Sequence, residues 1–415
     1  MFSKVRIISN RIFSGGKIFV SLNGVRRFIF YGFNGLILEK DNLTTVYTAK
    51  TVAGMEEVLK SELDLLGAVN AQILKRAVSF EGDKSLLYRA NYCCRTALRI
   101  LKPVLVFPIT KQDDLYNNIN RIEWEEYLDS QGSLAVDAVN ASSVFTNSQY
   151  IALKTKDAIV DRFREKTGGR PSVDLDNPDL RINIHIYKEV CTVSLDSSGS
   201  SLHKRGYRQV TGPAPLNEVL AAGLIQLSGW DKTIPLYDPM CGSGTILIEA
   251  NMLARNIPSG YFRPGFGFEK WKDFDAELWK KIRSEEDLKI KNVEVDILGS
   301  DNSSRAIATA TKNIDFTKFS DQIRLEVSDF ANTIPKTATG MIIFNPPYDE
   351  RMQVDDIIAF YKSIGDILKK KYTGFEAWII SSDLRALKFI GLHPSKKFIV
   401  FNGPLECKFV RFSLY

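Results

Sequence analysis

LYDPMCGSGT, residues 236–245, joins a short apolar strand to a helix that begins with ILIE at residue 246. In an open α/β sheet, ligands bind where a strand ends and its helix begins. Gly242 and Gly244 allow the backbone to approach a ligand closely, because they carry no side chain. Asp238, at the end of the strand, can set the loop and meet the positive end of a bound amino acid. The stretch therefore predicts a ligand-binding loop.

The residues around this loop alternate between apolar strands and helical segments. We expect strands at residues 234–238, 297–300, 323–327, 341–344 and 377–381. This order is typical of a doubly wound parallel sheet. The loop lacks the G-x-G-x-x-G spacing and the Lys-Ser/Thr pair of nucleotide-phosphate loops. What remains resembles the first motif of S-adenosylmethionine-dependent methyltransferases, and that motif would place the following residues at the cofactor: Asp238, Pro239, Cys241, Gly242, Ser243, Gly244 and Thr245.

Two further acids follow expected strands. Asp301 can accept both ribose hydroxyls of an adenosyl group, the role of an acid at the second strand of such sheets. Asp329 can read the adenine amino group, with Phe330 beside the ring. A helix N-cap is the alternative for each acid.

Asn345-Pro346-Pro347-Tyr348 directly follows the apolar strand at 341–344. An exocyclic amine on a base is a poor nucleophile, because its lone pair is delocalised into the ring. The side-chain oxygen of Asn345 and the carbonyl of Pro346 can each accept one N–H of such an amine. The rings of Pro346 and Pro347 fix the backbone that presents this carbonyl, and Tyr348 offers a flat face for an extruded base. The motif predicts methyl transfer to an exocyclic amino group.

The composition is that of a globular protein, with 44% hydrophobic and 25% charged residues in a chain of 415. That length suits two or three domains. No apolar run is long enough to cross a bilayer, and the five cysteines and three histidines show no zinc or disulfide spacing. We therefore expect a soluble, cytoplasmic protein with no membrane partner and no metal.

The net charge of +6 is concentrated in the first 42 residues, which hold seven Lys or Arg and two acids. Residues 1–43 form a basic leader that is typical of a transit peptide, of a disordered arm or of a start codon assigned too early. The remaining chain is nearly neutral. Any nucleic acid must therefore bind through local patches and shape.

The front half of the chain has the strand and helix pattern of small α/β modules. Residues 45–50 and 73–80 read as strands, on either side of a helix that Gly67 ends. We assign residues 44–85 to a ferredoxin-like segment and residues 86–197 to a second module. The second module has a helix at 147–166 and a hairpin that turns at Lys188-Glu189. Ser197–Ser201 reads as a flexible linker before the catalytic domain at 198–415.

Together these features resemble the THUMP-containing N2-guanine RNA methyltransferases, and most closely the bacterial 23S ribosomal RNA enzymes. The resemblance covers about residues 45–415 and includes Asn147–Tyr150, Lys156–Asp161, Leu202–Arg208 and Pro215–Glu218. It implies a ferredoxin-like piece, a THUMP RNA-binding domain over 86–197 and a Rossmann-like class I methyltransferase domain. It also implies that Pro215 and Asn217 lie near the methionine part of S-adenosylmethionine.

Two departures qualify this resemblance. The family's catalytic motif is commonly followed by Gly-Glu-Arg, whereas Asp349-Glu350-Arg351 follows it here. The added carboxylate can change how the loop closes. Close bacterial relatives also often carry a second methyltransferase at the C-terminus, which is not found in this sequence up to Tyr415.

Basic residues indicate RNA contacts only locally. Lys154 lies on the expected helix at 147–166, and Lys204, Arg205 and Arg208 lie at the domain junction. Tyr207, between two arginines, suits an unstacked base. For the helix, an ordinary solvated face explains the charges equally well.

Several alternatives share the Asn-Pro-Pro-Tyr motif. They are a guanine-N2 enzyme of transfer RNA, a DNA adenine-N6 methyltransferase and an enzyme that methylates a glutamine amide. The THUMP-like front half favours RNA over the last two. A non-catalytic RNA-binding protein is a further alternative, but it predicts a degraded pocket, and here the glycines, acids and catalytic loop are all present.

Overall fold

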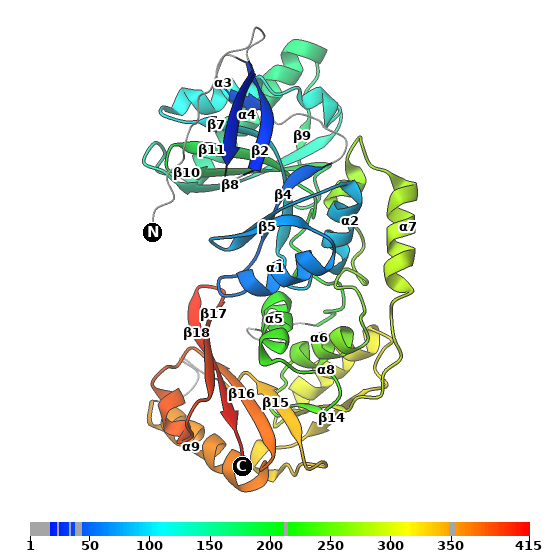
Figure 1. Ribbon diagram of the computed structural model, residues 1–415, viewed down its shortest axis with the longest axis vertical. Coiled ribbons are helices and arrows are strands. Elements are labelled where there is room, and N and C mark those ends of the chain that lie inside the picture. The colour runs from blue at the N-terminus through cyan, green and yellow to red at the C-terminus, as the bar shows by residue number, and fades with distance from the viewer. Residues whose placement is uncertain (1–16, 23–24, 33–34, 38–43, 211–214, 348–353) are drawn as a thin grey trace.

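The computed structural model describes the backbone of residues 17–22, 25–32, 35–37, 44–210, 215–347 and 354–415. Side chains are described for residues 44–210, 215–347 and 356–415. Figure 1 shows an N-terminal α/β half stacked above a C-terminal α/β half along the long axis. Among the described residues, no helix is long and apolar enough to cross a membrane.

The described residues of the N-terminal half form an 11-stranded sheet and four α-helices. Its strands are β1 (Lys17–Leu22), β2 (Val25–Gly32), β3 (Gly35–Ile37), β4 (Thr45–Lys50), β5 (Val69–Leu74), β6 (Ala77–Gly82), β7 (Arg99–Pro108), β8 (Ser133–Ala141), β9 (Ser172–Val173), β10 (Leu180–Tyr187) and β11 (Val190–Asp196). Its helices are α1 (Glu56–Leu65), α2 (Lys84–Cys93), α3 (Gln112–Asn120) and α4 (Ser148–Thr167). Strands β1 to β3 extend the sheet beside β7, which differs from the alternative of a disordered arm for these parts of residues 1–43.

The ferredoxin-like unit is built from β4, α1, β5, β6, α2 and the start of β7. Helix α1 buries Leu59 and Leu63, as its spacing predicted. The prediction of one strand at 73–80 is wrong, because the chain turns at Arg76 (φ 57°) and forms the antiparallel pair β5 and β6. No glycine or proline marks this turn. The unit also extends past residue 85, since β7 pairs with β4 through Arg99–Leu101.

The following module matches its sequence pattern closely. Helix α4 begins after Asn147, whose side chain accepts a hydrogen bond from Gln149 N at 2.7 Å. It ends at Gly168, which has a φ of 71°. Strands β10 and β11 form the expected antiparallel hairpin, with Ile184 opposite Val193 and Lys188 in the turn.

The stretch Ser197–Ser201 is not a flexible linker. Ser197 and Ser198 are fully buried. The Ser197 hydroxyl donates to Ile100 O at 2.7 Å, and the Ser198 hydroxyl donates to Asn91 Oδ1 at 2.7 Å. Arg263 further donates to the carbonyls of Ser198, Ser200, Ser201 and Lys204. Small polar residues suit this path because they can satisfy buried backbone groups at close quarters.

The C-terminal half is a seven-stranded sheet in the order β14-β13-β12-β15-β16-β18-β17. Its strands are β12 (Leu236–Asp238), β13 (Ile297–Asp301), β14 (Ile323–Val327), β15 (Gly340–Phe344), β16 (Phe375–Ser381), β17 (Lys396–Asn402) and β18 (Leu405–Ser413). Its helices are α5 (Glu218–Ser228), α6 (Thr245–Ala254), α7 (Ala276–Asp287), α8 (Ser304–Phe316) and α9 (Val354–Lys371). Strands β12 to β16 are parallel, and β18 pairs antiparallel with β16 and β17. The strand order reverses at β12, so the doubly wound fold places its ligand crevice there.

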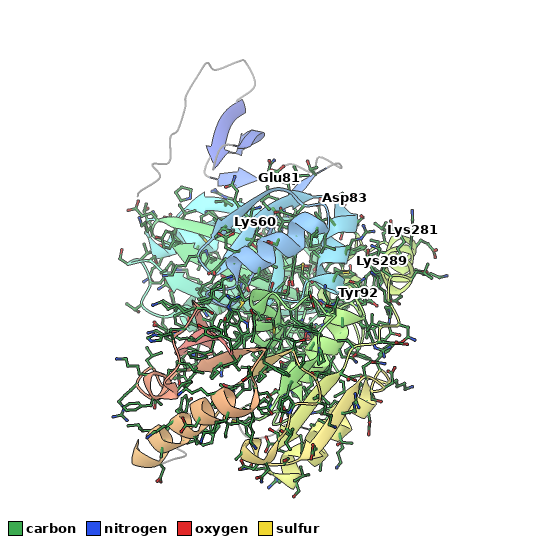
Figure 2. The ribbon with its side chains drawn as sticks, turned by 60° about the horizontal axis from the view of Figure 1, so that its bottom comes forward. Lys60, Glu81, Asp83, Tyr92, Lys281 and Lys289 are labelled. Carbon is green, nitrogen blue, oxygen red and sulfur yellow. The ribbon has the colours of Figure 1, made fainter. Side chains whose placement is uncertain are left out.

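The two halves share their hydrophobic cores. Val52 and Met55, just before α1, pack in the core of the catalytic sheet, and Phe266, Phe268 and Trp279, from the segment around α7, pack in the core of the N-terminal half. Figure 2 labels Tyr92 of α2 and Lys281 of α7 at this second contact, where the Tyr92 hydroxyl donates to Asp287 Oδ1 at 2.6 Å. The front modules are therefore fixed on the catalytic domain.

Candidate active site

The predicted ligand loop lies between β12 and α6, at the carboxyl edge of the sheet. Gly242 (φ 54°) and Gly244 (φ 80°) both adopt the left-handed backbone that favours glycine. A Cβ atom added at Gly242 would meet nothing within 4 Å, so open space lies beside the loop. The loop is held by hydrogen bonds from Gly244 N to Cys241 O at 2.8 Å and from Cys241 N to Ser300 O at 3.0 Å.

One cavity of about 1650 Å³ brings most of the predicted residues together. Its walls come from the ends of β12, β13, β14 and β15 and from the segment before α5. The predicted residues that line it are Pro215, Asp238, Pro239, Cys241, Gly242, Ser243, Thr245, Asp301, Asp329, Phe330, Asn345, Pro346 and Pro347. The glycine loop and the Asn-Pro-Pro motif, a hundred residues apart in sequence, thus face one space.

Asp238 is 2% exposed, and burial raises the pKa of its carboxyl well above the usual range, an effect to which the nearby Asp301 carboxylate adds. Met240 N donates to Asp238 Oδ1 at 3.1 Å. A buried carboxyl is expensive to ionise unless a cation lies beside it. Its surroundings therefore fit the ammonium group of a bound amino acid.

Asp301 braces the loop as well as lining the cavity. Its Oδ2 accepts a hydrogen bond from Gly242 N at 3.0 Å, and its Oδ1 accepts one from Ser303 N at 2.9 Å. Asp329 also lines the cavity, and its Oδ1 caps a short 3-10 turn through Ala331 N at 2.7 Å, as the N-cap alternative expected, while its contact with adenine stays a prediction. Phe330, 5% exposed, packs against Phe344 and Tyr372.

Asn345 carries the most informative atom of the site. Its Oδ1 is buried and accepts no hydrogen bond from any group of the described residues. A buried acceptor without a partner costs free energy, which is recovered only when a donor arrives. Because Asn345 lines the cavity, that donor can be an N–H of a bound substrate. Tyr348 and Asp349–Arg351 lie outside the described residues.

Asn217 is placed differently from the expectation. Its side chain caps α5, accepting hydrogen bonds from Val219 N at 3.0 Å and Leu220 N at 3.3 Å. It is not among the residues that line the cavity, whereas Pro215 is. Asn217 therefore shapes this wall through the helix start.

Two of the five predicted RNA-binding residues, Arg205 and Tyr207, are buried, which contradicts their assignment. Tyr207 is 1% exposed and donates to Glu249 Oε1 at 3.0 Å, so its ring cannot stack on an external base. Arg205, also 1% exposed, donates to the same oxygen at 3.3 Å. Arg208, whose side chain is 13% exposed, donates to Ser243 Oγ of the glycine loop at 3.0 Å, so little of it is available to RNA. Glu249, the partner of Arg205 and Tyr207, lies more than forty residues along the chain, so the sequence does not reveal that these two side chains are enclosed.

The two remaining cations are nearer the surface. Lys204 is exposed. Lys154 forms an ion pair with Asp113 at 3.1 Å and lies over the ring of Tyr150, 5.8 Å from its centroid. Both stay predictions for RNA contact.

Three family models match consecutive parts of the chain. Residues 47–101 match the RlmL ferredoxin-like domain, residues 110–196 match the THUMP domain, and residues 205–411 match the RMKL-like methyltransferase domain. A protein of Synechocystis, slr0064, named as a candidate RNA methyltransferase, is 38% identical over 374 residues, which cover 90% of this chain and 97% of the relative. The chain belongs to the RlmL-like THUMP methyltransferases.

Solved structures agree with this membership. SMU.472, named as a candidate methyltransferase and crystallised with S-adenosylhomocysteine, is 30% identical with a TM-score of 0.80 over 90% of this chain and 99% of its own. A Listeria monocytogenes protein described as a predicted N6-adenine-specific DNA methylase is 28% identical, with a TM-score of 0.79 over 90% of this chain and 97% of its own. This RlmL-like THUMP methyltransferase thus uses S-adenosylmethionine to methylate a nucleic acid. Within the described residues, no cluster of side chains could hold a metal ion.

Proposed function

We propose that this protein methylates the exocyclic N2 amine of a guanine in structured RNA, and that 23S ribosomal RNA is its substrate. The observation that carries the chemistry is the buried Oδ1 of Asn345 in the cavity wall, which has no hydrogen-bond partner among the residues that the structure describes. An exocyclic amine has two N–H donors, and one of them satisfies this acceptor. The THUMP match and the Synechocystis relative support RNA as the substrate class.

The cofactor-holding residues follow from the cavity walls. Asp238 would meet the amino-acid end of S-adenosylmethionine, Asp301 the ribose, and Asp329 with Phe330 the adenine. When bound there, the cofactor supplies an electrophilic methyl group. Pro215 and the loop from Cys241 to Thr245 would close the remaining sides.

The protein's own contribution to the chemistry is to orient the amine. Asn345 Oδ1 accepts one N–H and the Pro346 carbonyl accepts the other, which localises the lone pair on nitrogen. The Pro346 and Pro347 rings limit the backbone angles, so these acceptors need little reorganisation when the substrate arrives. Tyr348 is predicted to stack on the extruded base.

The Listeria relative's name favours a second candidate, methylation of adenine N6 in DNA. Adenine N6 presents the same NH2 group to Asn345, so the acceptor pair does not discriminate between the two bases. Transfer RNA guanine is a third candidate, since a THUMP domain suits any structured RNA.

The test is to incubate the full-length protein and radiolabelled S-adenosylmethionine with 23S rRNA, transfer RNA or duplex DNA, and to identify the labelled nucleoside by mass spectrometry. We expect N2-methylguanosine from 23S rRNA. Label in N6-methyladenine would refute the guanine assignment, and label confined to transfer RNA would refute the ribosomal one. Mapping modified guanines in cells with and without the protein checks the same result in vivo.

A further inference from the structure

The second half of the cofactor loop is braced from outside the sheet. Asp301 and backbone hydrogen bonds hold Cys241 and Gly242. Ser243 and Thr245 instead receive hydrogen bonds from side chains of Arg208 and Asn313, which come from before α5 and from α8. Glycines on either side of Ser243 leave the backbone free to move, so these external contacts set its position.

Arg208 holds four acceptors with one guanidinium group. Nη1 donates to Ser243 Oγ at 3.0 Å, and Nη2 donates to Thr245 Oγ1 at 2.9 Å and to Leu216 O at 3.2 Å. Nε donates to Glu218 Oε1 at 2.7 Å. The guanidinium is planar and rigid, so its acceptors are fixed relative to one another. Only 13% of the Arg208 side chain and 6% of the Glu218 side chain are exposed, which limits competition from water.

Asn313 makes a second set of hydrogen bonds, which also reaches Ser243 of the glycine loop. It is 1% exposed. Its Oδ1 accepts from Gln209 N at 2.9 Å and from Val210 N at 3.1 Å. Its Nδ2 donates to Val210 O and to Ser243 O, each at 3.2 Å. These contacts use both donors and both acceptor positions of the carboxamide.

Both sets of hydrogen bonds join the glycine loop to the cavity wall that is formed by the segment before α5. Val210, Pro215 and Leu216 line that wall, and Ser243 and Thr245 line the loop side. Arg208 and Asn313 do not line the cavity themselves. We propose that Arg208 and Asn313 are positioning residues that set the separation of these two walls and thereby the affinity for S-adenosylmethionine.

The test uses the full-length protein and titration calorimetry with S-adenosylmethionine and S-adenosylhomocysteine, so the outcome does not depend on which base is methylated. We expect Arg208→Met to raise both Kd values at least about tenfold, because hydrogen bonds from a charged donor to buried acceptors are stronger than neutral ones. Arg208→Lys, which keeps the charge but not the planar fork, should be intermediate. In turnover, the KM for S-adenosylmethionine should rise while kcat at saturation changes less than about threefold.

Arg162→Met is the matched control. The Arg162 side chain is 14% exposed, pairs with Glu125 through Nε at 2.9 Å and donates to Asn120 O at 3.2 Å, but it lies on α4 in the N-terminal half. Its loss should lower the unfolding temperature about as much as Arg208→Met and leave cofactor affinity unchanged. An equal rise in Kd for the two variants would overturn the proposal, because it would show general destabilisation.

A double-mutant cycle tests the route of the effect. In a Ser243→Ala, Thr245→Val background, Arg208→Met should raise Kd less than about twofold further, because its loop acceptors are already gone. If Arg208→Met raises Kd in that background as much as it does in the unmodified protein, its effect does not depend on Ser243 and Thr245, and this part of the proposal is refuted. Asn313→Asp, which keeps both acceptor contacts and loses the donations to Val210 O and Ser243 O, should also raise Kd, and an unchanged value would remove Asn313 from the proposal.

Discussion

Replacing Asn345 with alanine should lower turnover without lowering the stability of the folded protein. The side-chain oxygen lost in this variant is buried and has no partner among the described residues. An unsatisfied buried acceptor lowers the free energy of unfolding by about 1–3 kcal/mol. The alanine variant removes this cost, although it also loses a few packing contacts of the side chain. We therefore expect the free energy of unfolding without ligand to stay unchanged or to rise by up to about 1 kcal/mol.

Turnover should respond in the opposite way. Loss of one preorganised transition-state acceptor lowers kcat by about 100-fold or more, the scale observed for single oxyanion-hole groups. Cofactor affinity should stay near its original value, since Asp238, Asp301 and the glycine loop are intact. The assay is single-turnover methyl transfer at saturating substrate, together with denaturant unfolding and calorimetry on the same preparation.

The matched control is Asn118→Ala. Asn118 is 8% exposed and its Nδ2 donates to Asp114 O at 2.7 Å, so its loss should cost about 1 kcal/mol of stability with no change in kcat. If Asn345→Ala retains kcat within about threefold, Asn345 does not orient the reacting amine. If the Asn345→Ala variant is instead strongly destabilised, the Asn345 oxygen has a structural partner, and the argument from an acceptor without a hydrogen bond is wrong.

Asp301→Ala should weaken S-adenosylmethionine binding at least about tenfold in calorimetry, because it removes a carboxylate of the cavity and the acceptor for Gly242 N, and an unchanged Kd would exclude it from the cofactor site. RNA affinity should be unaltered. Tyr207→Phe should lower the free energy of unfolding by about 1 kcal/mol in denaturant titration, because it removes the buried hydrogen bond to Glu249, and an unchanged value would show that this bond does not stabilise the fold. Burial, and then Arg205, lower the pKa of His203 from 6.5 to about 4. The unfolded chain therefore binds the proton first, and stability should fall as pH drops from about 6.5 towards 4, with a shallower fall in His203→Asn by denaturant titration.

The parts of the fold that the sequence predicted are those with local causes. The α4 boundaries follow from Asn147 and Gly168, and the catalytic sheet follows from apolar strands that alternate with helices. The cavity could be anticipated because Asp238, Asp301 and Asn345 each end a strand, and the carboxyl ends of parallel strands share one edge.

What could not be predicted depends on partners distant in sequence. Arg205 and Tyr207 look like a basic surface patch until Glu249 of α6 is placed beside them. Asn313 gives no local signal, because it lies within α8 and its partners Gln209 and Ser243 are 104 and 70 residues away in the sequence. The serines at 197–201 suggest flexibility by composition, but hydrogen bonds with Arg263 and Asn91 hold this stretch in place, and Ser197 and Ser198 are buried.

The contact between the first module and the catalytic sheet leaves very little free space. A Cβ atom at Gly54 would lie 2.4 Å from the Ile399 carbonyl, and one at Gly223 would lie 2.3 Å from the sulfur of Met55. The two surfaces therefore pack so closely at these glycines that a different surface would not fit. Exchange of the front modules between related enzymes would therefore require compensating changes on both sides, so new nucleic-acid targets are more accessible through substitutions in exposed loops than through recombination of whole domains.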